Sequence, residues 1–356
     1  MNTTTGSFKP ASLNSGGRFF RFDPIFWLES YLYKYRYIAW TLVAIAALGV
    51  PSLGFSMFMM RIFTMIGVFA MLALGLNILT GYAGQVSLGH AGFFAIGGYT
   101  SALLMMNFGL GFFPAMALAG LVAAACGLLL GLPTLRLSGP YLTIITLGFG
   151  EITRIIIINW ASVTNGTLGL RGIPMPQVLG HTLTLGNNGL YYLMLAMLLF
   201  TSLACYAIAN SRIGRAFLAI KEDPIAATMM GIRTTHFKVL AFMLSAFIAG
   251  ITGAFYAPLL GFIDHNTFDF DMSILILSIV IVGGMGTLRG MFIGSAILIA
   301  FPEASRALMD YRFVVYGLLL VLMMRFRPQG LLGWKSRMPY KLPKLARKEI
   351  EAEASK

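Results

Sequence analysis

The stretch from Met65 to Leu135 contains a single Asp, Glu, Lys, Arg or His side chain, His90. A soluble fold cannot leave so long a segment without charge, because its surface has to be hydrated. A helix that crosses the hydrocarbon core of a bilayer needs about 20 apolar residues, so this stretch has room for about three spans. Over the whole chain 58% of the residues are hydrophobic and 11% are charged, and the mean hydropathy is +0.79. The sequence therefore predicts a polytopic, all-α membrane protein.

Apolar length predicts about ten spans, formed into one transmembrane helical bundle. The expected spans cover about residues 37–55, 57–80, 86–106, 112–132, 141–159, 190–208, 239–260, 273–282, 291–302 and 313–324. The third span is rich in glycine and is a candidate re-entrant segment, and the eighth is short. The predicted transmembrane domain therefore covers residues 37–325.

The basic residues are clustered and predict the orientation of the spans. Of the 26 Lys and Arg, 19 lie in the N-terminal tail (1–36), the segment 212–238 and the chain from Arg325 onward. Cytoplasmic loops of membrane proteins carry this excess. Ten spans place the tails 1–36 and 326–356 and the loop 211–238 all in the cytoplasm. We read the net charge of +13 as a topology signal that membrane lipid can reinforce, and expect no nucleic-acid partner and no cleaved signal peptide.

Two regions in opposite halves of the chain are rich in glycine. Two explanations stay open: broken helices that build a transport pathway near the membrane midplane, and tight helix packing through small residues. The first region has Gly81, Gly84, Gly89, Gly92, Gly97 and Gly98, and the second has Gly283, Gly284, Gly286, Gly290 and Gly294.

Polar side chains in and near the first Gly-rich region are candidates for a substrate pathway. Irregular backbone in a membrane has to be covered by protein or line a wet cavity. His90 has an alternative role as a packed residue bonded to a backbone carbonyl. Glu151 and Arg154 lie three residues apart on one helix face, where they either form an ion pair at a pathway or subunit interface, or Arg154 extends to the outer membrane surface. The candidate pathway residues are Gln85, Ser87, His90, Thr143, Thr146 and Glu151.

The chain resembles the permeases of high-affinity branched-chain amino acid ABC importers, of the LivM type, from about residue 57 to 333. The motifs are Gly81-Tyr-Ala-Gly-Gln85, Ser87-Leu-Gly-His90, Phe94-Ala-Ile-Gly-Gly-Tyr99, Gly139-Pro-Tyr-Leu-Thr-Ile-Ile-Thr-Leu-Gly-Phe-Gly-Glu-Ile152, Asn165-Gly166 with Gly169-Leu170, and Gly283-Gly-Met-Gly-Thr-Leu-Arg-Gly290. The resemblance implies a heteromeric importer in a bacterial cytoplasmic (inner) membrane. Its partners would be a second, LivH-type permease, two ATP-binding subunits and a periplasmic or extracellular substrate-binding protein.

The basic loop contains a short predicted helix. Asp223 is a good N-cap and Pro224 suits the first helical position, while Gly231 can end the helix in a left-handed conformation. Ala226 and Ala227 would give this helix a small, smooth surface that fits a groove on a partner. The helix resembles the coupling helix that ABC importer permeases insert into their ATPases. The candidate coupling residues are Glu222, Asp223, Pro224, Ala226, Ala227, Gly231 and Ile232.

Several kinds of chemistry have no sequence signal. No Gly-x-x-x-x-Gly-Lys-Ser/Thr phosphate loop occurs, so we expect ATP to be hydrolysed on a separate subunit and no cofactor or metal to be bound here. Cys126 and Cys205 lie in apolar runs and are interpreted as packing residues. The alternatives to a branched-chain amino acid permease are a urea or short-amide ABC importer permease, a stand-alone secondary transporter and an intramembrane enzyme. The Asp223–Gly231 helix argues against a lone carrier, which has no need of it.

Overall fold

The computed structural model describes residues 49–134, 139–178, 181–304, 317–318, 320–323, 325 and 330–331. The predicted N-terminal tail, most of the first span, half of the tenth span and nearly all of the C-terminal tail lie outside these residues. The chain divides into two units, one up to Gly54 and one from Phe55 onward. The described part of the first unit is a 3-10 helix, η1 (Val50–Leu53), followed by Gly54 in a left-handed conformation.

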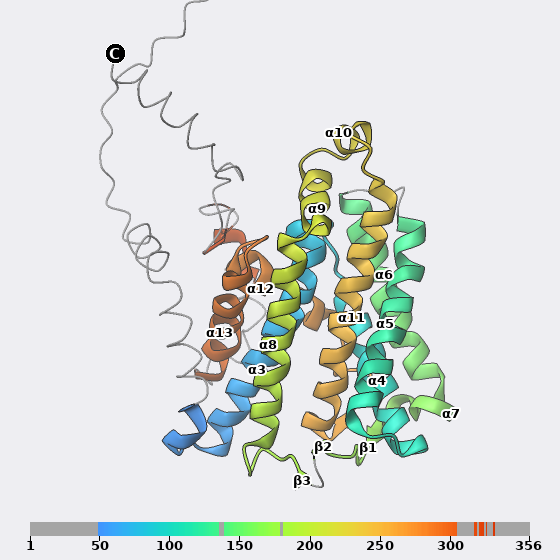
Figure 1. Ribbon diagram of the computed structural model, residues 1–356. Coiled ribbons are helices and arrows are strands. Elements are labelled where there is room, and N and C mark those ends of the chain that lie inside the picture. The colour runs from blue at the N-terminus through green and yellow to red at the C-terminus, as the bar shows by residue number, and fades with distance from the viewer. Residues whose placement is uncertain are drawn as a thin grey trace, which may run out of the picture. The chain divides into compact units, whose positions relative to one another are not determined.

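Among its described residues, the second unit contains six long apolar helices (Figure 1). At about 1.5 Å per residue each is about 28 Å or longer, which is enough to cross a bilayer. They confirm the second to seventh predicted spans. The helices are α3 (Met57–Asn77), which a π-helical turn η2 (Ile78–Tyr82) extends, α4 (His90–Phe108), α5 (Phe112–Thr134), α6 (Pro140–Asn159), α8 (Gly189–Asn210) and α11 (Thr234–Leu260).

Two shorter apolar helices follow, α12 (Phe270–Gly283) and α13 (Leu288–Ala304). They correspond to the predicted eighth and ninth spans, and each starts three residues earlier than expected. Of the predicted tenth span, residues 317–318 and 320–323 are described and helical. The described residues therefore confirm a polytopic all-α membrane fold with six helices long enough to span.

Helices α3 and α11 form the centre of the bundle. In the most apolar 18-residue stretch of each, 78% is buried inside the chain, whereas in α6 and α8 the buried share is 22%. Helix α11 packs along α4 and α5, and α3 contacts α8, α12 and α13. Because α6 and α8 leave most of their apolar surface outside, they are the helices that lipid or another subunit has to cover.

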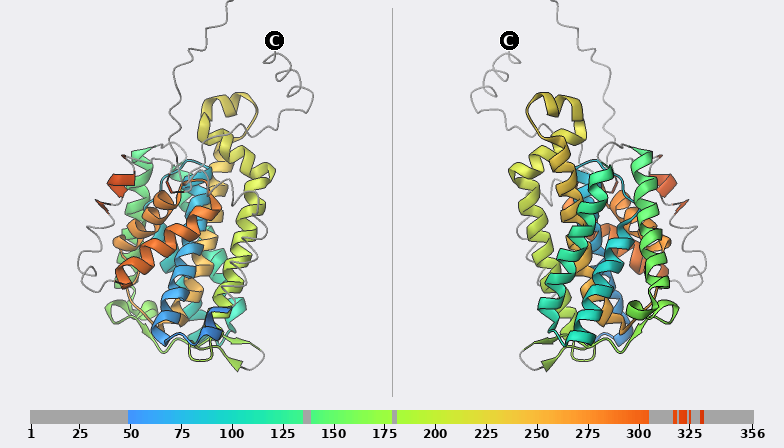
Figure 2. Two further views of the ribbon diagram at one scale, coloured as in Figure 1. Left: turned by 90° about the vertical axis from the view of Figure 1, so that its left-hand side faces the viewer. Right: turned by 90° about the vertical axis from the view of Figure 1, so that its right-hand side faces the viewer.

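The two ends of the bundle carry different connections (Figure 2). One end carries α9 (Arg212–Glu222) and α10 (Pro224–Met229). The opposite end carries the short helices α7 (Ala161–Thr164) and η3 (Gly166–Leu168) and four two-residue strands in two antiparallel pairs. Strand β1 (Leu170–Arg171) pairs with β4 (Phe262–Ile263), and β2 (Gln177–Val178) pairs with β3 (His181–Thr182).

Most of the segment predicted as a basic loop, 211–238, is helical. Helix α9 was not predicted, although its pattern is amphipathic: Ala216, Phe217 and Ile220 are buried, and basic residues alternate with them. Ser211 caps α9 by accepting hydrogen bonds from the N–H groups of Ile213 and Gly214. The short helix predicted inside this segment is therefore the second of two.

The glycine-rich regions contain both a break between helices and close helix contacts, whereas the predicted transport pathway at the break stays a prediction. Residues 83–89 form no helix between η2 and α4, so the third span starts at His90 rather than at residue 86. Within α4, by contrast, the backbone of α11 lies so close that a Cβ atom on Gly97 would overlap the carbonyl oxygen of Gly250. In the second region, Gly284 and Gly286 lie in the turn between α12 and α13. Some of these glycines therefore lie in non-helical segments between helices, and others allow two helices to pack closely.

Candidate functional site

Helix α10 forms where the sequence predicts it. The Asp223 carboxylate oxygen Oδ1 accepts hydrogen bonds from the N–H groups of Ile225 (2.8 Å) and Ala226 (3.1 Å). Pro224 occupies the first helical position, where a missing N–H costs nothing. The predicted N-cap and proline position are confirmed.

The end of α10 also agrees with prediction. Gly231 has φ +82°, a left-handed conformation that residues with a Cβ adopt only under strain. The N–H of Gly231 donates to the Thr228 carbonyl at 2.9 Å and the N–H of Ile232 to the Ala227 carbonyl at 3.0 Å. Gly231 therefore satisfies the last carbonyls of α10 and turns the chain toward α11.

The outward surface of α10 differs from the prediction. Ala227 is only 4% exposed, so it packs inward and cannot form the expected smooth docking surface together with Ala226, which is exposed. Its small side chain lets α10 lie against α9 and α11, which it contacts. The outer surface is instead apolar and bulky, formed by Ile225, Met229 and Met230, each at least 73% exposed. Three large apolar side chains at a helix tip are the chemistry of a protein contact.

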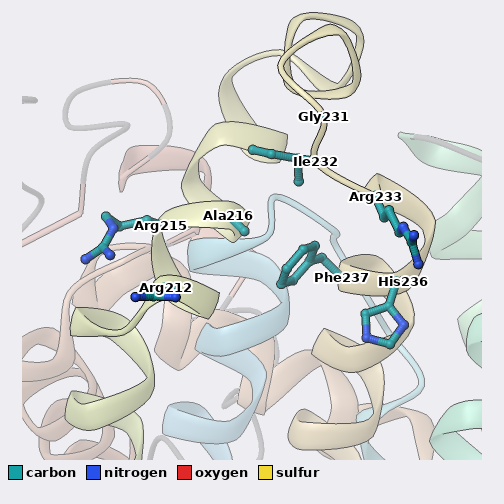
Figure 3. A pocket seen from close by; sticks show the side chains of 8 residues that line it. All are labelled: Arg212, Arg215, Ala216, Gly231, Ile232, Arg233, His236 and Phe237. Atoms are coloured by element: carbon teal, nitrogen blue, oxygen red, sulfur yellow. The ribbon is translucent and has the colours of Figure 1, made fainter.

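A hollow of about 610 Å³ lies between α9, α11 and the chain that leaves α10 (Figure 3). Ala216, Ile232 and Phe237 lie around its middle, with Arg215 on the α9 side and Arg233 and His236 on the α11 side. The basic groups lie on opposite sides and do not converge on one point. The hollow therefore lacks the arrangement of a single-anion site, and it leaves space around the base of α10.

The break at residues 83–89 packs against α6. The N–H of Leu88 donates to Thr146 Oγ1 at 3.0 Å, and Thr143 Oγ1 donates to the Val86 carbonyl at 3.3 Å. The structure therefore brings Thr143 and Thr146, predicted as pathway residues from their span alone, into direct contact with the predicted break. The freed backbone groups of the break are partly satisfied by these threonines.

Three of the predicted pathway residues are buried in the chain. Ser87 and His90 are fully buried and Gln85 is 6% exposed. Within the described residues, neither ring nitrogen of His90 has a hydrogen bond of good geometry, and the backbone of Leu72 on α3 is the polar group that they approach. Gln85 Oε1 is likewise buried without a partner in the described part of the chain. These groups lie inside the packed bundle, and their role in a pathway stays a prediction.

Glu151 and Arg154 form an ion pair on α6, which is one of the two arrangements that the sequence left open. Arg154 Nη1 lies 3.5 Å from Glu151 Oε2, and the side chains are 33% and 38% exposed, respectively. Glu151 lies about 16 Å along α6 from Pro140, near the middle of the span. A half-exposed ion pair at this depth is costly in lipid, so protein or water has to cover its open side.

Two residues outside the predicted site, Asn77 and Lys221, contact the glycine-rich regions. Asn77 Oδ1 accepts from the N–H of Gly286 at 2.8 Å, and Asn77 Nδ2 donates to the Thr287 carbonyl at 3.3 Å. Lys221 Nζ donates to the Gly81 carbonyl at 2.8 Å. Asn77 offered a signal, because a lone buried amide in an apolar helix needs a partner. No sequence signal marks the contact of Lys221 with Gly81, because Lys221 is one of several basic residues in its segment.

Comparisons with known proteins agree with these features. The family described as branched-chain amino acid transport system / permease component matches residues 58–324. The chain is 40% identical over 291 residues to the high-affinity branched-chain amino acid transport system permease protein LivM of Salmonella typhimurium, covering 76% of this chain and 68% of the relative. It is 39% identical to LivM of Escherichia coli with the same coverage, and 27% identical to LivH of Escherichia coli over 74% of this chain and 91% of the relative.

No solved structure matches the chain significantly. The family match nevertheless covers the six long helices, except for the first residue of α3. It also covers the break at residues 83–89 and helix α10. The multi-pass helical fold and the capped helix at one end agree with this match. The chain therefore belongs to the family of branched-chain amino acid transport system permease components.

Proposed function

We propose that this chain is the permease subunit of an ATP-driven importer and forms part of the transmembrane pathway for leucine, isoleucine and valine. Support comes from the family match and from the substrate class in the names of its LivM and LivH relatives. The structural observation that carries the proposal is α10, a capped helix at one end of the bundle with Ile225, Met229 and Met230 exposed. A transporter that works alone has no need of such a helix.

We further propose that α10 is the coupling helix and docks on an ATP-binding subunit. Glu222, Asp223, Pro224, Ala226, Gly231 and Ile232 would form or border the contact, with the three bulky apolar residues at its centre. Ala227 would position the helix from beneath. Two ATP-binding subunits, a LivH-type second permease and a substrate-binding protein complete the proposed importer, and ATP would be used by the partner subunits, with no cofactor bound by this chain.

The proposed topology has ten spans with both termini in the cytoplasm of a bacterium and the bundle in its inner membrane. Residues 1–36 and 326–356 would be basic cytoplasmic tails on either side of the permease domain 37–325. Support comes from the basic residues of 211–238, which lie on α9 and at the start of α11, at one end of the bundle. That end would then be cytoplasmic.

The open side of Glu151 on α6 is proposed to face the second permease or the water-filled pathway between the two. We expect Glu151→Ala to lower leucine uptake, because it leaves Arg154 unpaired at membrane depth. The measurement is uptake of labelled leucine, normalised to the amount of the chain in the membrane. Ile152→Ala, which removes apolar surface from the adjoining exposed position, is the matched control and should transport normally. Unchanged uptake by Glu151→Ala would exclude Glu151 from the pathway.

The substrate class is tested in a strain that lacks the chain. Restoring the chain should restore uptake of labelled leucine, isoleucine and valine and leave urea uptake at background. Uptake of urea without leucine would contradict the proposal and favour a short-amide importer. The same strain with an empty vector controls for other carriers.

A further inference from the structure

We propose that Lys221 is a positioning residue that connects the coupling helix α10 to the break between α3 and α4. Through this contact a movement of α10 would be passed to that break and to the turn between α12 and α13. The proposal rests on the proposed role of α10 and adds the physical connection from it to the transmembrane helices.

Lys221 lies at the last turn of α9, two residues before the N-cap of α10 at Asp223. Its ammonium donates to the carbonyl oxygen of Gly81 at 2.8 Å. Gly81 lies in the π-helical turn η2, at the end of α3, where helix carbonyls lack partners in their own helix. A charge-assisted hydrogen bond thus closes the end of the broken helix from a neighbouring element.

The lysine stem makes a second contact with the same break. A Cβ atom on Gly84 would lie 3.0 Å from Lys221 Cγ, so the aliphatic part of the side chain covers the backbone of Gly84. Lys221 therefore holds the segment between α3 and α4 at two points, by its ammonium at Gly81 and by its stem at Gly84.

Gly81 connects this contact to the turn between α12 and α13. A Cβ atom on Gly81 would lie 2.5 Å from the backbone nitrogen of Gly286, which shows how closely the two segments approach. Asn77 lies one helical turn before Gly81, and its hydrogen bonds to Gly286 and Thr287 hold the segment between α12 and α13 in place. The chain of contacts runs from α10 through Lys221 and the α3–α4 break to the turn between α12 and α13. π-helical turns are frequent at functional sites, and these contacts give a displacement of α10 a direct route to both turns.

The test uses the assembled importer in proteoliposomes and measures leucine transported per ATP hydrolysed. Lys221→Met keeps the stem and removes the ammonium. We expect transport per ATP to fall about tenfold, the size of one charge-assisted hydrogen bond, while ATP hydrolysis stays within about twofold of wild type. Lys221→Arg keeps a charged donor and should retain most of the coupling. Lys238→Met removes a lysine from the same segment but away from the junction, and should behave as wild type.

Lys221→Gln, which keeps an N–H donor without the charge, provides a second measurement if Lys221→Met does not assemble, and should give an intermediate ratio. A wild-type ratio in Lys221→Met, or in Lys221→Gln where only that variant assembles, would overturn the proposal. Failure of the proposed function is separate, because the wild-type importer itself would then show no transport that depends on ATP.

Discussion

Replacing Gly231 with valine is expected to abolish leucine uptake while the protein still inserts into the membrane. Gly231 has φ +82°, and a residue with a Cβ pays about 1–2 kcal/mol to adopt the left-handed region, more if it is β-branched. Valine will therefore favour another backbone conformation, which breaks the hydrogen bonds that end α10 and changes the direction in which the helix presents Ile225 and Met229.

The surroundings of Gly231 separate this effect from misfolding. No atom lies within 4 Å of the place where a Cβ would stand, so the side chain itself meets no clash within the chain. Gly231→Asn is the matched control, because asparagine tolerates the left-handed conformation, and it should keep most of the uptake. Uptake is measured beside the amount of the chain in the membrane. Wild-type uptake by Gly231→Val at normal expression would contradict the docking role of α10.

Replacing Gly97 with alanine is expected to destabilise the bundle strongly. Even one methyl group at this position would overlap the carbonyl oxygen and the Cα atom of Gly250, and backbone atoms cannot move aside as a flexible side chain can. Because α11 packs along α4 and α5 at the centre of the bundle, the helices would have to separate. We expect a loss of about 3 kcal/mol or more, at the upper end of the range for overpacked cores.

The measurement is the thermal unfolding midpoint of the purified protein in detergent, with the yield of inserted protein as a second readout. Gly148→Ala is the matched control, because no atom lies within 4 Å of its Cβ position on α6. It should leave the midpoint unchanged or raise it slightly, since alanine is the better helix former. Equal midpoints for the two variants would show that α4 and α11 are not in close contact.

The parts of the fold that depend on local chemistry could be predicted from the sequence. Apolar length gave the second to seventh spans, and the Asp-Pro pair with Gly231 gave α10 to within a residue. These predictions hold because each depends on residues that act within one element. Most of the first span and of the two tails lies outside the described residues, and these parts stay predictions.

The parts that depend on partners far away in the sequence were predicted less well. The pattern of α10 does not show which side faces α9 and α11, so Ala227 was wrongly placed on its outer surface. The segment of α9 was predicted as a loop because its basic residues are typical of cytoplasmic loops, although Phe217 and Ile220 mark an apolar face on it. The contact between Lys221 and Gly81 joins residues 140 positions apart, and no local pattern marks it.

The central claim is that this chain is one part of a transport pathway whose energy comes from ATP on other subunits. The direct measurement is uptake of labelled leucine into proteoliposomes that hold this chain with its proposed partners, with the binding protein outside the vesicle and ATP inside. We expect uptake that needs every subunit and stops when ATP is replaced by a non-hydrolysable analogue. Leucine uptake by this chain alone, driven by an ion gradient without ATP, would contradict it.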